Sequence, residues 1–79
     1  MMPLNRFLEL TGRLTLSSLE YDQAQQWGWD AMPPSIVIRA LEEAIAKTPE
    51  ARRIKARLSW YRHDVKDAYH DWRRAVGPY

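Results

Sequence analysis

Glycine and proline divide this chain into segments of helical length, and the positions of these residues constrain the fold more than any other feature. Gly12 and Gly28 follow the first two segments, Pro33–Pro34 and Pro49 precede the later ones, and residues 50–76 contain neither residue type. Glycine favours the end of a helix and proline its first turn. No segment shows the sustained apolar–polar alternation that a half-buried strand requires. The sequence therefore predicts an all-α protein.

Two helices are expected in the first third of the chain. The first covers about residues 3–11, and Gly12 ends it. The second begins after Ser17, because Ser17-Ser18-Leu19-Glu20 matches a capping box. In that motif the serine hydroxyl and the glutamate carboxylate each accept a hydrogen bond from a free backbone N–H group of the first turn. This second helix reaches Trp27 and ends at Gly28.

A turn and a third helix follow. Residues 29–34 are expected to form the turn, since two prolines force extended geometry on the residues before them. The helix is expected from about Pro34 to Lys47. Val37, Leu41 and Ile45 recur there at the spacing of a buried helical face.

After this helix the pattern leaves two arrangements open. Thr48-Pro49-Glu50 predicts a helix start in which Thr48 is the capping residue. Apolar residues then step by three and four along one helical face. They are Ala51, Ile54, Leu58, Tyr61, Val65, Ala68, Trp72 and Ala75. Such a seam fits one long helix, and it fits equally a short helix to about Lys55, a break, and a helix capped by Ser59.

Together these segments predict a compact bundle of four to five short helices whose final helix is long, basic and aromatic. With 79 residues, the chain is expected to form a single helical domain over residues 1–79. It contains no Cys, which excludes disulfides and thiol nucleophiles and favours a cytoplasmic location. No apolar run is long enough to cross a membrane, and early charges interrupt any signal-peptide pattern.

Catalysis finds little support in the sequence. It contains neither a glycine-rich phosphate loop nor a nucleophile elbow. The serines stand at expected caps or helix starts, where local backbone hydrogen bonding explains them. We therefore expect a protein that is not an enzyme, has no cofactor and has no membrane partner.

Charge is distributed unevenly along the chain. Residues 1–34 carry two basic and four acidic side chains, a net charge of −2. Residues 51–79 carry eight basic and three acidic side chains, a net charge of +5. Such asymmetry is typical of proteins that bind polyanions, although basic residues also simply solvate exposed helix faces.

Four stretches occur in the same order as similar stretches of one protein family. They are Phe7–Arg13, Leu16–Glu20, Ile36–Ala44 and Leu58–Tyr61. Over roughly residues 5–72 the chain resembles the C-terminal helical domain of the DnaD-like primosome proteins of bacteria and phages.

The resemblance extends to a motif in the last helix of that family, Tyr-x-x-x-Ile-x-x-x-Trp. Here Tyr61, Val65 and Tyr69 stand at the three positions, so the final Trp is replaced, and the nearest Trp is Trp72. The resemblance implies contact with DNA during replication initiation or helicase loading, with replication proteins or a second copy as further partners. The family's winged-helix domain has no counterpart in this sequence.

Basic and aromatic residues of the last third are the predicted DNA contacts. They are Lys55, Arg57, Trp60, Tyr61, Arg62, Lys66, Arg73 and Arg74. Basic side chains would bind the phosphates of single- or double-stranded DNA, and an exposed Trp60 or Tyr61 would touch bases. Packing of Trp60 on a neighbouring helix and of Tyr61 in the core are the structural alternatives.

His63, Asp67 and His70 are a weaker candidate for a metal site. Their spacing places all three on one side of a helix, and imidazole with carboxylate suits Zn²⁺ or a similar ion. A solvated stripe that balances the basic residues is the simpler interpretation. The rival to DNA binding is a protein-interaction or self-association module without nucleic-acid affinity, since aromatic residues and Arg are also enriched at interfaces.

Overall fold

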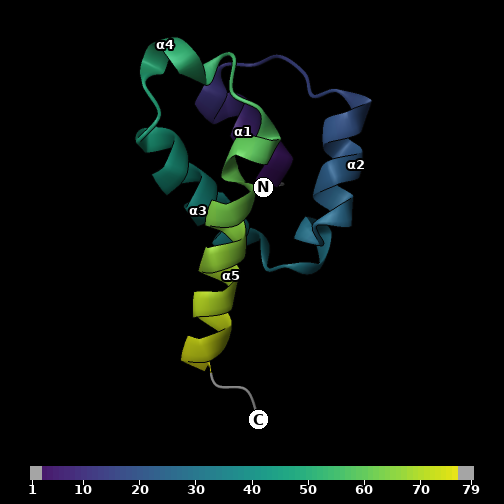
Figure 1. Cartoon of the computed structure of the whole chain (residues 1–79), viewed down its shortest axis with the longest axis vertical. Coiled ribbons are helices and arrows are strands. Elements are labelled where there is room, and N and C mark those ends of the chain that lie inside the picture. Colours follow the sequence, from purple (N-terminus) through teal and green to yellow (C-terminus); the bar gives the residue numbers. More distant parts are fainter. Residues whose placement is uncertain (1–2, 77–79) are drawn as a thin grey trace.

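Helices follow one another through residues 3–76, the part of the chain that the computed structural model describes. They are α1 (Pro3–Thr11), α2 (Ser18–Gln26), η1 (Trp29–Ala31), α3 (Pro34–Ala46), α4 (Glu50–Arg53), η2 (Leu58–Tyr61) and α5 (Arg62–Val76), where η marks a 3₁₀ turn (Figure 1). The described residues contain no strand. The all-α prediction and the helical bundle with a long last helix are confirmed.

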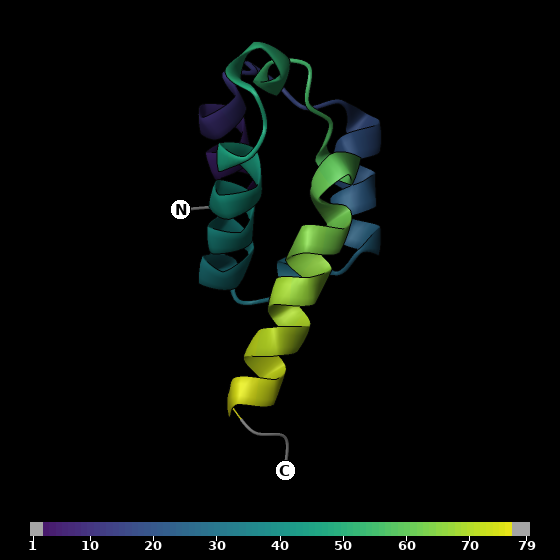
Figure 2. The ribbon, with the colours of Figure 1, turned by 60° about the vertical axis from the view of Figure 1, so that its left-hand side comes forward.

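Helix α3 is central because it packs against both α1 and α5 (Figure 2). Its predicted apolar face is the buried one, with Val37, Leu41 and Ile45 all in the core. Phe7 of α1 is also fully buried, and its ring meets that of Tyr61 edge to face at 6.0 Å. Removing a side chain as buried as Leu41 typically costs about 2–5 kcal/mol, so the contacts of α3 contribute substantially to the stability of the bundle.

Helix α2 begins as its sequence predicts. The Ser17 hydroxyl accepts a hydrogen bond from the Glu20 N–H, and the Glu20 carboxylate accepts one from the Ser17 N–H. Gly28 ends this segment with φ at +78°, a conformation that residues with a Cβ atom rarely adopt. The expected turn after it contains the short η1, and there Trp29 is buried, which the sequence did not indicate.

The chain between α3 and α5 contains a break, which decides between the two predicted arrangements. Helix α4 ends at Arg53, residues 54–57 form a turn and a short extended stretch, and η2 leads directly into α5. Arg57, in extended conformation, precedes the new segment, and Ser59 makes no capping hydrogen bond. The prediction of Ser59 as the cap is therefore wrong.

Thr48 is not a helix cap either. Pro49 holds that position before α4, and no side chain caps the helix. The Thr48 hydroxyl instead donates to the Ala44 carbonyl oxygen and lies 2.9 Å from the Tyr61 hydroxyl. The residue thus connects the end of α3 to the start of the last helical segment.

The break also changes which residues of the predicted apolar seam are buried. Leu58, Tyr61 and Val65 lie in the core, but the side chain of Ile54 is 59% exposed. Ala56, which is outside the seam pattern, is fully buried in its place. A continuous helix would keep one register from residue 51 onward, whereas the extended stretch before η2 starts a new one.

Candidate nucleic-acid interface

The charged residues of α5 are separated onto two sides of the helix. At about 100° per residue, Arg62, Lys66 and Arg73 project within about 40° of one another. Three aspartates project from roughly the opposite side. They are Asp64, Asp67 and Asp71. We call the first side the basic side of α5.

The basic side of α5 borders an open groove that aromatic residues line. Its wall on the other side comes from the end of α2 and from η1. The groove holds about 310 Å³, and its lining residues are Gln26, Trp27, Trp29, Met32, Arg62, Lys66, Tyr69 and His70. We call it the aromatic groove. It combines flat apolar rings with two cations, which are the groups that nucleotides require.

Arginine side chains lie against aromatic rings along this side. The Arg62 guanidinium carbon is 5.4 Å from the centroid of the Trp27 ring, and that of Arg73 is 5.8 Å from the Tyr69 ring. Such cation–π contacts at exposed sites are worth only about 0.5–1 kcal/mol, so the guanidinium groups remain free to turn toward an anion. Within residues 3–76, neither Arg62 nor Lys66 makes an ion pair with a carboxylate.

Arg74 belongs to a different surface. Its side chain is 82% exposed, and its guanidinium lies 3.9 Å from the Asp71 carboxylate. Asp71 in turn borders α3. The structure therefore separates Arg74 from the basic side, although the sequence groups it with Arg73.

Lys55 and Arg57 line a second groove, between the first turns of α2 and residues 54–59. It holds about 290 Å³, and among its lining residues are Leu19, Gln23, Ile54, Lys55, Ala56 and Arg57. We call it the aliphatic groove. Of the eight predicted DNA-contact residues, Arg62 and Lys66 thus line the aromatic groove, and Lys55 and Arg57 line the aliphatic groove. The other four line neither groove; they are Trp60, Tyr61, Arg73 and Arg74.

Tyr61 does not reach the surface. Its side chain is 3% exposed, its ring packs on Phe7, and its hydroxyl is engaged by Thr48. The prediction that Tyr61 touches bases is therefore wrong, and core packing, the alternative, holds. Trp60 is 49% exposed but lines neither groove.

Nothing in the sequence pattern indicates that Trp27 and Trp29 belong to a site. The pattern predicts Trp27 at the end of a helix and Trp29 in a turn, and only the tertiary structure brings both into the groove beside α5. Their rings lie 5.5 Å apart. Tyr69 is predicted only as one position of the motif in the last helix, and its place three residues after the exposed Lys66 gives no separate indication of a site.

The predicted metal candidates do not form a site. His63, Asp67 and His70 project from neighbouring sides of α5, as their spacing requires. However, no group of three His, Cys, Asp or Glu side chains in the described part of the chain is arranged to hold a metal ion. A single helix supplies too few ligands for a metal site, and within the described residues no other element adds a ligand to those of α5.

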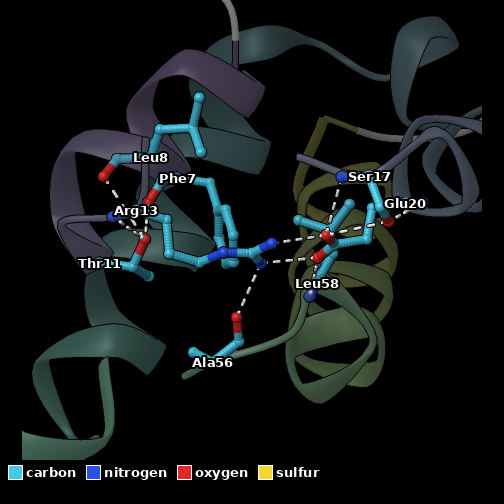
Figure 3. Close-up of polar contacts among 8 residues, drawn as sticks. All are labelled: Phe7, Leu8, Thr11, Arg13, Ser17, Glu20, Ala56 and Leu58. Atoms are coloured by element: carbon cyan, nitrogen blue, oxygen red, sulfur yellow. Dashed lines mark hydrogen bonds and ion pairs between the residues drawn. The ribbon is translucent and has the colours of Figure 1, made fainter. Parts of the chain in front are cut away.

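A partly buried ion pair joins Arg13, in the connection between α1 and α2, to Glu20 of α2 (Figure 3). Both residues line the aliphatic groove. The Arg13 guanidinium donates to both carboxylate oxygens of Glu20 at 2.7 and 2.8 Å, and also to the Ala56 carbonyl oxygen at 2.9 Å. Glu20 additionally accepts from the N–H groups of Ser17 and Leu58. These hydrogen bonds, above all those from Arg13, lower the pKa of Glu20 to about 2. Glu20 is therefore ionised and fully engaged, which suits a structural role.

Among the described residues, no helix is both long and apolar enough to cross a membrane. Comparisons of the whole chain with protein-family models, with curated proteins and with solved structures gave no match.

Proposed function

We propose that this chain is a non-catalytic, DNA-associated accessory domain that holds the phosphate backbone on the basic side of α5. One observation carries the proposal: the cations Arg62 and Lys66 have no carboxylate partner within residues 3–76, while the aspartates of the same helix project away from them. The resemblance to DnaD-like primosome proteins supplies the biological setting, which is replication initiation or helicase loading in a bacterium or phage.

Phosphate binding would come from three side chains in one row. Arg62, Lys66 and Arg73 follow the axis of α5 at intervals of one and two helical turns. Each phosphate that such a residue neutralises releases counterions, so affinity falls steeply as salt rises. Contacts of this kind are independent of base sequence, which fits an accessory role.

The aromatic groove would receive unpaired bases beside those phosphates. Trp27 and Tyr69 come from different elements, and their rings line the groove next to Arg62 and Lys66. Stacking of a base on an aromatic ring is worth about 1–3 kcal/mol. Trp60 is exposed as well, but it lies outside this groove.

Fluorescence anisotropy with labelled oligonucleotides tests the proposal. Affinity should be measurable at about 50 mM salt and should fall steeply by about 200 mM. The double variant Arg62→Glu/Lys66→Glu should lose binding. A matched control, Arg39→Glu/Arg74→Glu, makes the same change in net charge away from the basic side and should retain most of it.

Two outcomes contradict the proposal. One is no detectable affinity for single- or double-stranded DNA at low salt. The other is equal weakening by the two double variants, which would show a response to net charge alone rather than to a site. Circular dichroism of both variants confirms that the fold is retained.

The alternative function is a protein-interaction or self-association module without nucleic-acid affinity. Part of the apolar seam, which would have supplied the contact surface, is occupied, since Leu58, Tyr61 and Val65 are buried in the chain's own core. Apolar side chains are exposed elsewhere, however, at Leu19 and Ile54. A sample without DNA affinity would favour this alternative.

A further inference from the structure

The aliphatic groove lies outside the proposed DNA site and is lined by different kinds of side chain. Leu19 and Ile54 line it with their side chains 66% and 59% exposed, and no aromatic ring is among its lining residues. Large aliphatic side chains this exposed leave apolar surface in contact with water, which burial against a partner would remove. The groove therefore offers apolar contact area without a stacking surface.

The charge of this groove is positive and uncompensated. Arg13 and Glu20 also line it, but they neutralise each other across a 2.7 Å ion pair. Lys55 and Arg57 are exposed, and neither forms an ion pair in the described part of the chain. The groove thus presents two free cations beside two aliphatic side chains.

The walls of the groove are held in place before any ligand binds. Arg13 donates to the Ala56 carbonyl oxygen, and the Leu58 N–H donates to Glu20, so the segment that carries Lys55 and Arg57 is tied to α2 (Figure 3). A preformed groove binds with less loss of conformational entropy than one that must be ordered.

From these observations we infer that the aliphatic groove docks an acidic segment of a partner protein. Leucine-like side chains of that segment would pack between Leu19 and Ile54, and carboxylates of that segment would pair with Lys55 and Arg57. Nucleic acid fits this groove less well, because aliphatic side chains offer bases no ring to stack on. The inference concerns a different groove from the proposed DNA site and does not depend on it.

Selection from a library of random linear peptides, with the full chain as bait, tests the inference. Enriched peptides should combine Asp or Glu with Leu, Ile or Phe. Their affinity should fall by about tenfold or more, equivalent to about 1.4 kcal/mol, in Leu19→Ser/Ile54→Ser and again in Lys55→Glu/Arg57→Glu. Because all four side chains are exposed, these substitutions should leave the fold intact, which thermal melting verifies.

The matched control is Arg62→Glu/Lys66→Glu, which should bind the selected peptides as well as the original chain does. This separates the inference from the DNA proposal, since that variant is expected to lose only DNA binding. The inference is overturned if no acidic, apolar peptides are enriched, or if they bind the Leu19→Ser/Ile54→Ser variant unchanged.

Two other occupants would also overturn it, and the same variants detect them. If Lys55→Glu/Arg57→Glu weakens oligonucleotide binding while no peptide is selected, the groove belongs to a nucleic-acid surface. If sedimentation shows a dimer that Leu19→Ser/Ile54→Ser dissociates, the groove is covered by a second copy of this chain.

Discussion

The Glu20 carboxylate accepts a hydrogen bond of 3.2 Å from the backbone N–H of Leu58, a residue 38 positions further along the chain. The same carboxylate closes the capping box of α2 through Ser17 and pairs with Arg13. One side chain therefore fixes the start of α2, the α1–α2 connection and the start of the last helical segment. Since Arg13, Glu20 and residues 54–57 line the aliphatic groove, the shape of that groove depends on this carboxylate.

Glu20→Gln is expected to lower the free energy of unfolding by about 1–3 kcal/mol, because hydrogen bonds to a charged group are lost and Arg13 keeps a partly buried charge without a counterion. Urea denaturation measures the change. Asp22→Asn, on the exposed side of the same helix, removes the same charge and should stay within about 0.5 kcal/mol of the original chain. Similar losses in the two variants would contradict the role assigned to Glu20.

Acid should destabilise the protein in part through Glu20. The pKa of this carboxyl falls from its ordinary value of 4.5 to about 2 in the folded chain, chiefly because Arg13 donates to it. A lowered folded pKa means that the unfolded state takes up the proton first, so stability is lost as pH falls from about 4.5 through about 2. Urea denaturation at a series of pH values should show this slope, and Glu20→Gln should flatten it. An unchanged slope in the variant would show that other carboxyl groups are responsible.

Tyr61→Phe should separate stability from DNA binding. The substitution removes the hydroxyl that lies 2.9 Å from that of Thr48 but keeps the ring against Phe7. We expect a loss of about 0.5–1.5 kcal/mol in unfolding free energy. Oligonucleotide affinity should not change, since the side chain is buried. A loss of oligonucleotide affinity without a loss of stability would show that Tyr61 contacts DNA.

Two aromatic substitutions should differ in their effect on single-stranded DNA. Tyr69→Leu removes a ring from the aromatic groove and should weaken binding by about 1–3 kcal/mol. Trp60→Ala removes an exposed ring that lines neither groove and should leave affinity nearly unchanged. Anisotropy titrations of both variants with the same oligonucleotide make the comparison. The reverse order of effects would place the base contacts at Trp60 instead.

Several elements were readable from sequence because local interactions specify them. Helix α1, the capping box of α2 and the apolar face of α3 all depend on residues within a few positions of one another. Two of the wrong predictions concern Thr48 and Ser59, whose residue types suit a cap. Thr48 is instead engaged by Tyr61, a partner 13 positions away. The cap position before η2 is held by Arg57, two residues before Ser59.

The sequence by itself determined that this chain is helical, where most helices begin, and that its positive charge is concentrated in the last third. Only the tertiary structure decided where the last helical region breaks, which aromatic residues are buried, and which basic residues line each of the two grooves. The physical reason is that these properties depend on pairs distant in sequence. Glu20 with Leu58 and Trp27 with Arg62 are such pairs, and no periodicity along one segment encodes which residue of another segment will face it.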